Sequence, residues 1–334
     1  MVKLGEYIDG ATQLPYVAEG VKLRGRTIFL LPLFSNKPGE WFAFLPSGSG
    51  RLQRVALVDV IQGSYIAAAP IDPSSDFCLP LANLVFQQMS FSGVARPLMG
   101  LEDAIEGTAS LLDLYEIVSN LHTAGHPGAS QLTQALVNQL FVVSRSLFDV
   151  LQSLCRAVCS VVKRLDDPGK PLMKNLPTSF ARVALHGDKP RSTDEISAKY
   201  GMPEPIAKFY RSQAPFLADI RQIRDGVIHR GHNVGYVMNL DEGLAVPTRD
   251  APWNRLEIWD GACVGENELG SLRRLFAHVI HESAAATTRF AETFFSCIDL
   301  PAPISPGNRV FLRSPLNHYL IGIHHTLASP WERI

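Results

Sequence analysis

The chain has 334 residues, of which 46% are hydrophobic, and its formal net charge is −1 at pH 7. This length allows one large domain or two ordinary ones, and the apolar content is sufficient for a folded core. The near-neutral charge excludes a protein that is basic over its whole surface, so a binding site for nucleic acid must be a local patch. Candidates for that patch, which equally fit a solvated helix face, are Lys208, Arg211, Arg221, Arg224 and Arg230.

The cysteines indicate a reducing compartment. Their number, five, is odd, and Cys155 and Cys159 stand one turn apart in an apolar helical segment. Disulfide frameworks are instead typical of small secreted chains with even cysteine counts. The sequence shows neither an N-terminal signal nor an uncharged apolar run of about 18 residues that could span a membrane. We therefore expect a cytoplasmic protein that does not associate with membranes.

Residues 1–100 are predicted to form a small antiparallel β unit. Short apolar runs separated by turn-forming residues predict a curled sheet of about four or five strands. The runs cover residues 27–34, 41–45, 55–60 and 65–69. The segment Ser47-Gly-Ser-Gly50 is interpreted as a turn, because a phosphate-binding loop would need a following Lys-Ser/Thr and a helix.

Residues 101–300 are predicted to form a helical domain, because apolar residues recur there at helical spacing. Besides the helix that carries the polar motif described below, helices are expected over residues 101–121, 130–165, 193–200 and 267–297. The second of these has the widest apolar face, so we expect it to be the central buried helix.

Two segments depart from a plain helical bundle. An insertion near residues 233–260 contains two runs typical of strands, at 235–240 and 255–259. The tail at 301–334 is expected to pack on the body of the protein and to add a strand at 310–312. The expected fold class is therefore α+β, a predominantly α-helical bundle with a small N-terminal antiparallel β unit.

The polar motif lies in a helix that is predicted from about residue 214 to residue 230. Pro215 suits its first turn and Gly231 suits its exit. At about 100° per residue, Asp225 and His229 fall roughly opposite the apolar face and are expected to face water, a substrate or another protein. That apolar face is formed by Phe216, Ile220, Ile223 and Val227.

Three neighbouring residues of this helix suit acid–base chemistry on a phosphodiester. Arg224, Asp225 and His229 place a cation, a carboxylate and a titratable imidazole within about two helical turns. Asp225 stands one turn before His229 and could hold the imidazole in orientation. Arg224 and His229 diverge by about 140° on a regular helix. Either Gly226 distorts the helix locally, or two copies of the helix face each other across a dimer. We favour the dimer, because it would bring both groups to one phosphate without strain.

The pattern Arg224-Asp225-Gly-Val-Ile-His229, late in a set of long helices, resembles the HEPN superfamily motif. In that motif an arginine, often followed directly by a polar residue, precedes a histidine by a few positions. The resemblance covers residues 104–300 and implies an all-helical domain that dimerises and brings two motifs together. Many members are metal-independent ribonucleases of toxin–antitoxin, phage-defence or RNA-processing systems. The β insertion departs from this pattern and could cover the motif or build part of a substrate groove.

For this chain the resemblance implies an endoribonuclease that uses neither a metal nor an organic cofactor. Its catalytic residues would be Arg224, Asp225 and His229. Its expected partners are RNA and a second copy of the chain, with a protein such as a cognate antitoxin as a further candidate. Candidate contacts to the substrate are Arg221, Arg230 and His232. The last of these could instead cap the helix by interacting with its dipole.

Two other functions fit the sequence. The helical domain could be a dimerising or RNA-binding module that cleaves nothing, because a fold does not fix a function. A metal hydrolase is the third reading, since His278 and His281 lie three residues apart on a helix and could share a metal ion. They could equally be polar flanks of a packed helix. A third ligand would have to come from His318, His324 or His325.

Arg145, in the predicted central helix, has two possible roles. It could reach the same polar site as Arg224, or it could pair with Asp149 one turn later. The sequence leaves both open.

Overall fold

The computed structural model describes residues 7–8, 14–18, 33–47, 51–89, 91, 93–163, 173, 175–229, 236–259, 264–265, 268–329 and 331. Over these residues the protein is mixed α+β and about 54% helical, with nine helices, which confirms the predicted class. The chain groups into two compact units. Unit 1 comprises Met1–Glu102, Leu154–Pro171 and Thr287–Ile321, and unit 2 comprises Asp103–Ser153, Leu172–Ala286 and Gly322–Ile334.

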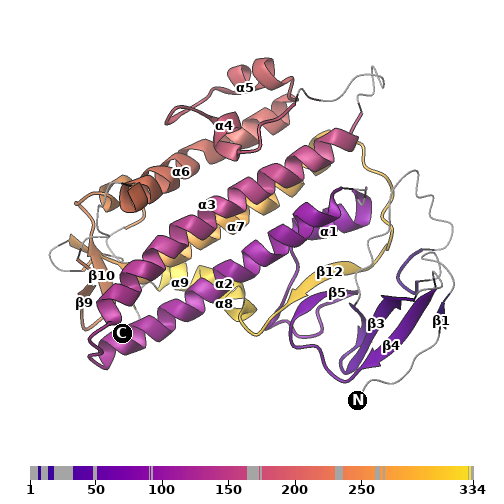
Figure 1. Ribbon diagram of the computed structural model, residues 1–334, viewed down its shortest axis with the longest axis horizontal. Coiled ribbons are helices and arrows are strands. Elements are labelled where there is room, and N and C mark those ends of the chain that lie inside the picture. The colour runs from indigo at the N-terminus through magenta and orange to yellow at the C-terminus, as the bar shows by residue number, and fades with distance from the viewer. Residues whose placement is uncertain are drawn as a thin grey trace. The chain divides into compact units, whose positions relative to one another are not determined.

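Unit 1 is organised around a sheet that has seven strands among the described residues (Figure 1). In sheet order these are β1 (Tyr7–Ile8), β4 (Leu52–Leu57), β3 (Glu40–Pro46), β2 (Leu33–Lys37), β5 (Gly63–Ala67), β12 (Arg309–Arg313) and β6 (Asp76–Phe77). The pairing of β2 with β5 is parallel and the other pairings are antiparallel. The predicted antiparallel unit therefore contains one parallel pair, and the strand β12, from near the C-terminus, lies between β5 and the edge strand β6.

The predicted strands agree with the structure in part. Three of the four apolar runs overlap β3, β4 and β5, and the strand expected at 310–312 is β12. The first run, 27–34, overlaps β2 only at its end, since residues 27–32 lie outside the described part. Residues 58–60 were expected to be extended but follow the end of β4, where Val58 is 72% exposed. The short strands β1 and β6 gave no apolar pattern.

The sheet of unit 1 has an aromatic core. Tyr65, on β5, lies edge-on to Trp41 of β3 with ring centroids 5.0 Å apart, and it stacks on Phe311 of β12 at 5.5 Å. All three rings are buried. Helix α1 (Pro80–Gln88) is tied to the C-terminal segment of the same unit, because Gln87 accepts from the Ser305 backbone N–H and donates to the Ser305 carbonyl.

A buried carboxylate links β5, β6 and β12. The side chain of Asp76 is fully buried and accepts hydrogen bonds from the Tyr65 hydroxyl at 2.7 Å and from the Asp72 backbone N–H at 2.5 Å. The Arg313 guanidinium donates to both of its oxygens at 3.2 and 3.3 Å. Burial and the bond to Asp76 raise the pKa of Tyr65. The charge of Asp76 is thus matched by donors from three parts of the chain.

The long helices of the protein are α2 (Ala95–Thr123), α3 (Ala129–Val161), α6 (Glu204–His229) and α7 (Leu272–Cys297). The predictions for α2, α3 and α7 are confirmed to within a few residues. The division between the units falls within these three helices. Leu140, Leu147 and Leu151 of α3 are fully buried, as expected for the central helix. None of the helices in the described ranges combines the length and apolar character that crossing a membrane requires.

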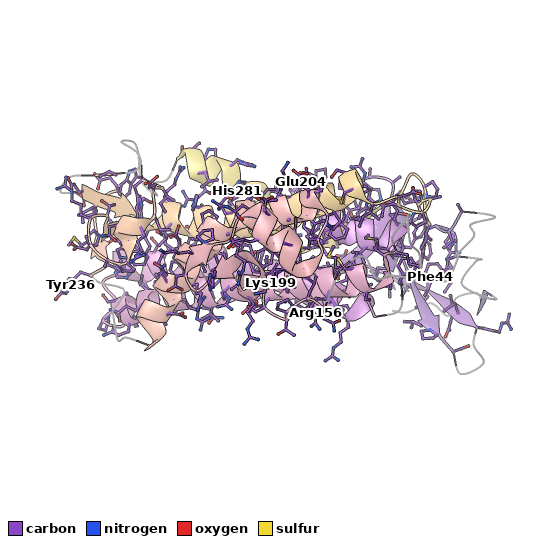
Figure 2. All side chains as sticks on the ribbon, turned by 90° about the horizontal axis from the view of Figure 1, so that it is seen from above. Phe44, Arg156, Lys199, Glu204, Tyr236 and His281 are labelled. Atoms are coloured by element: carbon purple, nitrogen blue, oxygen red, sulfur yellow. The ribbon has the colours of Figure 1, made fainter. Side chains whose placement is uncertain are left out.

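The insertion of unit 2 contains strands, although not both of those predicted. Strands β9 (Met238–Asn239) and β10 (Leu244–Pro247) lie within it, and β10 also pairs with β11 (Leu269–Ser271), which follows the insertion, to form an antiparallel sheet. The run at 255–259 is not a strand, since it begins with the last residue of a 3₁₀ turn, η2 (Trp253–Arg255). Trp253 in this turn is fully buried, and its ring centroid lies 6.3 Å from that of Phe141 on α3. Tyr236, 85% exposed, projects away from the ribbon (Figure 2).

Replacing Asp76 by alanine is expected to lower the free energy of unfolding by about 3–5 kcal/mol, because it leaves Arg313 without its partner in a largely buried setting. Urea unfolding followed by circular dichroism measures the change. Glu40→Ala is the matched control, since it breaks an exposed ion pair with Lys37 in the same sheet and should cost well under about 1 kcal/mol. Equal losses for the two variants would contradict the role given to the buried carboxylate.

Candidate functional site

Three short elements of unit 2 pack on α6 and position the candidate site (Figure 1). They are α4 (Phe180–Ala184), the hairpin of β7 (Leu185–His186) and β8 (Lys189–Pro190), and α5 (Thr193–Tyr200). Gly187 makes the tight hairpin turn with a φ of 63°, a conformation that glycine adopts without strain. The prediction of α5 is confirmed, while α4 and the hairpin are too short to show a periodic pattern.

The ends of α5 follow from local chemistry. Ser192 and Glu195 form a reciprocal capping box, in which the Ser192 hydroxyl accepts from the Glu195 N–H at 3.2 Å. The Glu195 carboxylate accepts from the Ser192 N–H at 2.7 Å, and this bond lowers the pKa of Glu195. Gly201 ends the helix in the left-handed conformation, with a φ of 68°. These caps fix where Lys199 and Tyr200 emerge.

The helix of the motif is longer than predicted. It begins at Glu204, ten residues before the expected start, and Pro215 lies inside it. Phe209 and Tyr210, which precede the proline, are buried against Phe180 of α4, with ring centroids 6.0 and 4.5 Å apart. This burial offsets the backbone hydrogen bond that a proline removes from a helix interior. The prediction that Pro215 starts the helix is therefore wrong.

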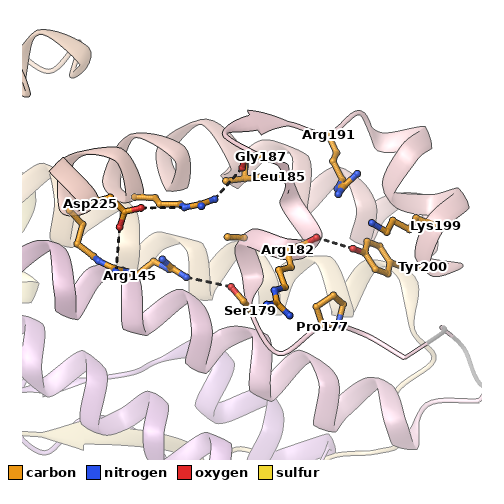
Figure 3. A pocket seen from close by; sticks show the side chains of 13 residues that line it. Arg145, Pro177, Ser179, Arg182, Leu185, Gly187, Arg191, Lys199, Tyr200 and Asp225 are labelled. Carbon is orange, nitrogen blue, oxygen red and sulfur yellow. Dashed lines mark hydrogen bonds and ion pairs between the residues drawn. The ribbon is translucent and has the colours of Figure 1, made fainter. Parts of the chain in front are cut away.

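A cavity of about 730 Å³ opens between these elements, and all of its lining residues belong to unit 2 (Figure 3). Six of the lining side chains are cationic, whereas one, Asp225, is acidic. The cationic residues are Arg145, Arg182, Arg191, Lys199, Arg221 and Arg224. We call this cavity the arginine pocket. Such a density of positive charge in a concave site favours an anion, because the walls focus the field of the cations.

The end of the arginine pocket that α6 forms is partly neutralised. Arg224 Nη2 lies 3.4 Å from Asp225 Oδ1, and Arg221 Nε lies 3.6 Å from Asp225 Oδ2. Arg221 also pairs with Asp188 at 3.6 Å and donates to the Gly187 carbonyl at 3.1 Å. The side chains of Arg221, Arg224 and Asp225 are a quarter to a third exposed and that of Asp188 is more exposed, so each pair contributes only about 0.2–1 kcal/mol. The contacts orient the guanidinium groups but leave them accessible to an anion.

Arg145 fulfils both of its predicted alternatives. Its Nη2 lies 3.4 Å from Asp149 Oδ2 and 3.4 Å from the Ser179 hydroxyl, and the residue lines the same pocket as Arg224. Asp149 in turn accepts from the Phe180 N–H at the start of α4. The Nε atom of Arg145 is buried without a hydrogen-bond partner. Arg145 therefore keeps donor capacity beside the pocket.

The opposite end of the pocket was missed by the sequence analysis. Figure 3 shows Arg182, Arg191 and Lys199 on the side away from Asp225, around Tyr200. None of these three cations has an ion-pair partner within 4.0 Å among the described residues. The sequence offered one signal for this end, the concentration of Arg and Lys residues in 182–199. These residues line one cavity only because the hairpin and α5 fold against α6.

The predicted site residues are brought together in part. Arg221, Arg224 and Asp225 meet in the arginine pocket. His229 is the last residue of α6 and its side chain lies outside the description, as do the whole residues Arg230 and His232. The proposed orientation of His229 by Asp225 therefore stays a prediction. Of the other patch candidates, Lys208 pairs with Glu204 at 2.7 Å, and neither it nor Arg211 lines the pocket.

A second cavity of about 410 Å³ in unit 2 contains His278. The His278 ring lies edge-on to Phe216 at 6.0 Å, and burial lowers the pKa of His278. Burial also raises the pKa of Asp219, which lines the same cavity. The ring of His281 lies 4.8 Å from that of His324. Among the described residues, no group of three or more His, Cys, Asp or Glu side chains is arranged to hold a metal ion.

His278→Gln is expected to make folding less sensitive to acid. Because the folded pKa is lowered, the unfolded chain gains a proton first once the pH falls below about 6.5. The contribution of His278 to stability is therefore full above that pH and declines as the pH falls toward the folded pKa. Urea unfolding at pH values from about 7.5 to about 5 should show that the free energy of unfolding falls less for the variant than for the wild type. His325→Gln is the control, because His325 is at an exposed position; its free energy of unfolding should fall with pH as that of the wild type does. Equal falls for all three proteins would refute the contribution assigned to His278.

Comparison with known proteins identifies no relative of this chain. No family model matches it, and neither a curated protein nor a solved structure is significantly similar.

Proposed function

We propose that unit 2 binds RNA in the arginine pocket and acts as a HEPN-type, metal-independent endoribonuclease. The observation that carries the proposal is the position of Arg221, Arg224 and Asp225 in a strongly cationic cavity. Arg224 and Asp225 belong to the Arg-Asp-x3-His segment that resembles the HEPN motif, and Arg221 stands three residues before it. A chain with a net charge of −1 has no general affinity for polyanions, so a local concentration of arginine indicates a specific anion site.

Guanidinium groups suit RNA phosphates in particular. Arginine offers a planar set of donors that can contact two phosphate oxygens at once, and it stays charged at every physiological pH. The pocket volume of about 730 Å³ is large enough for more than one phosphate group to approach its walls. In the proposed complex Arg224 faces the scissile phosphate, and Asp225 holds the Arg224 guanidinium in place.

The proposed reaction is attack of the RNA 2′-hydroxyl on the adjacent phosphate. A bond forms between the 2′-oxygen and phosphorus, and the bond from phosphorus to the 5′-oxygen breaks. The proton lost by the 2′-hydroxyl is matched by one gained by the leaving oxygen, which gives a 2′,3′-cyclic phosphate and a 5′-hydroxyl. His229 carries out one of these proton transfers, and Arg224 stabilises the charge that develops on the phosphoryl oxygens.

The proposed assembly is a homodimer in which the motifs of two copies face each other. A regular helix directs Arg224 and His229 about 140° apart, so the second copy would complete the site. Such an enzyme fits a toxin–antitoxin or phage-defence system, with an antitoxin as a further partner. Sedimentation analysis of the purified protein tests the dimer directly.

A non-catalytic RNA-binding module is the second candidate. It is favoured by three cations, Arg182, Arg191 and Lys199, that lie at the end of the pocket away from the motif. They have no ion-pair partner within 4.0 Å among the residues that the structure describes. In that case the pocket would bind RNA, and the purified protein would leave it intact.

His229→Ala and Arg224→Ala are each expected to reduce RNA cleavage by at least about 10². Cleavage of labelled RNA in excess EDTA measures the effect. Lys208→Ala is the matched control on the same helix, because Lys208 is exposed, pairs with Glu204 and does not line the pocket. It should cleave like the wild type. Undiminished cleavage by His229→Ala would remove this residue from the mechanism.

Binding of RNA is expected to depend strongly on salt. For single-stranded RNA the slope of log K against log salt is about −0.7 for each phosphate neutralised. Replacing Arg182, Arg191 or Lys199 should make the slope less steep by about that amount per residue. Fluorescence anisotropy between 50 and 300 mM salt, about the range in which such contacts are titrated, gives the slopes. A slope that none of the three substitutions changes would exclude the pocket as the binding site.

A further inference from the structure

We infer that Arg182, Arg191 and Lys199 form a subsite for a terminal phosphate monoester of the RNA. This inference rests on the proposed RNA-binding function and adds a specificity to it. The three residues, which we call the end subsite, come from α4, from the residue after β8 and from α5. They share one end of the arginine pocket (Figure 3).

The first argument is charge. At the motif end Asp225 and Asp188 pair with Arg221, Asp225 also pairs with Arg224, and Asp149 pairs with Arg145. The end subsite has no ion pair within 4.0 Å among the described residues. The neighbouring Glu195 interacts with Arg191 electrostatically, since the charge of Arg191 helps to lower the pKa of Glu195. Glu195 forms no ion pair with Arg191 within 4.0 Å and does not line the pocket, and its carboxylate accepts the Ser192 N–H. An internal phosphodiester carries one negative charge, whereas a phosphate monoester carries about −1.5 to −2 at pH 7.

The second argument is the supply of hydrogen-bond donors. The Nε atom of Arg191 is buried without a hydrogen-bond partner. A monoester offers three terminal oxygens, one more than the non-bridging pair of a phosphodiester. In Figure 3 the ends of the Arg191 and Lys199 side chains turn toward the space beside Tyr200, and Arg182 lies between Ser179 and Tyr200. Two guanidinium groups and one ammonium group therefore border the same end of the cavity.

The third argument concerns what this end does not offer to a base. Tyr200 is 5% exposed, its hydroxyl donates to the Arg182 carbonyl at 2.8 Å, and Lys199 Nζ lies 5.4 Å from its ring centroid. The ring is thus covered and is the one aromatic residue among the described lining residues. Stacking on aromatic rings is the usual way in which proteins hold unpaired bases. The end subsite is built for a phosphate.

If the end subsite binds a phosphate monoester, another reaction must first produce the RNA end that it recognises. The cleavage proposed above leaves a 5′-hydroxyl and a cyclic phosphate, and neither is a monoester. The RNA end that the subsite recognises must therefore come from a reaction that leaves a terminal monophosphate, such as hydrolysis of a phosphodiester or of a terminal polyphosphate.

The test uses short RNA oligomers with 2′-O-methyl groups throughout, which block attack by the 2′-oxygen, so that binding is measured without cleavage. Four versions of one sequence carry a hydroxyl or a phosphate at the 5′ end or at the 3′ end. We expect one phosphorylated version to bind wild-type protein about tenfold or more tightly than its hydroxyl counterpart, as expected for a gain of one or two charge-assisted hydrogen bonds. The end at which the gain occurs identifies the source of the monoester.

Variants locate the gain. Arg182→Ala, Arg191→Ala and Lys199→Gln should each reduce the preference for phosphate, and Arg224→Ala should keep it. Lys189→Ala is the matched control, because Lys189 is an exposed residue of the same hairpin that does not line the pocket. Circular dichroism checks that each variant is folded, and Lys199→Gln, at an exposed position, tests the subsite even where an arginine variant fails to fold.

The outcomes separate this inference from the proposed function. Equal affinity of the wild type for phosphate and hydroxyl ends, absence of oligomer binding, or a preference that all three subsite variants keep would overturn the end subsite. In the first case cleavage of natural RNA could still establish the nuclease. A phosphate preference that the subsite variants lose, in a protein that cleaves nothing, would support the subsite and reject the nuclease.

Discussion

The position of the Phe180 ring between α3 and α6 is the constraint on which the arginine pocket depends. Its ring centroid lies 5.2 Å from that of Phe148 on α3 and 4.5 Å from that of Tyr210 on α6. Asp149 accepts the Phe180 N–H, and the Tyr210 hydroxyl donates to Gln152 Oε1 at 2.6 Å. These contacts anchor the start of α4, so the Ser179 and Arg182 side chains that flank it face the pocket. The packing of Phe180 in the core thereby determines where the Arg182 side chain lies at the pocket.

The charge of the pocket illustrates how a nearly neutral protein can hold a strongly cationic site. Fixed cations repel one another, and the structure limits this cost by placing carboxylates behind one part of the cluster. Asp149, Asp188 and Asp225 compensate the arginines of α3 and α6, whereas the cations around α5 have no ion pair within 4.0 Å in the part of the chain that the structure describes. A ligand would therefore be attracted first to the uncompensated end. The pocket is therefore more positive near α5 than at the end that α6 forms.

The sequence predicts those parts of the fold that depend on regular patterns. The wide apolar face of α3 places that helix correctly, and the apolar run at 310–312 reveals β12. Pro215 misled the prediction of α6, because the burial of Phe209 and Tyr210 is a tertiary effect that local preference does not contain. The sequence likewise did not predict the cations at the end of the pocket away from Asp225. Arg182, Arg191 and Lys199 have no periodic relation, and only the turn at Gly187 and the cap at Gly201 bring them together.

The position of β12 within the sheet affects how this sheet can fold while the chain is being synthesised. Its Arg313 reaches Asp76 across 237 positions of sequence, and β12 lies between β5 and β6. Until residues 309–313 have been synthesised, β5 and β6 lack the strand that pairs with both, and Asp76 lacks the Arg313 guanidinium. Strand pairing between such distant segments is slow, and exposed edges invite association between nascent chains. This unit therefore depends, more than a sheet of consecutive hairpins would, on protection during translation.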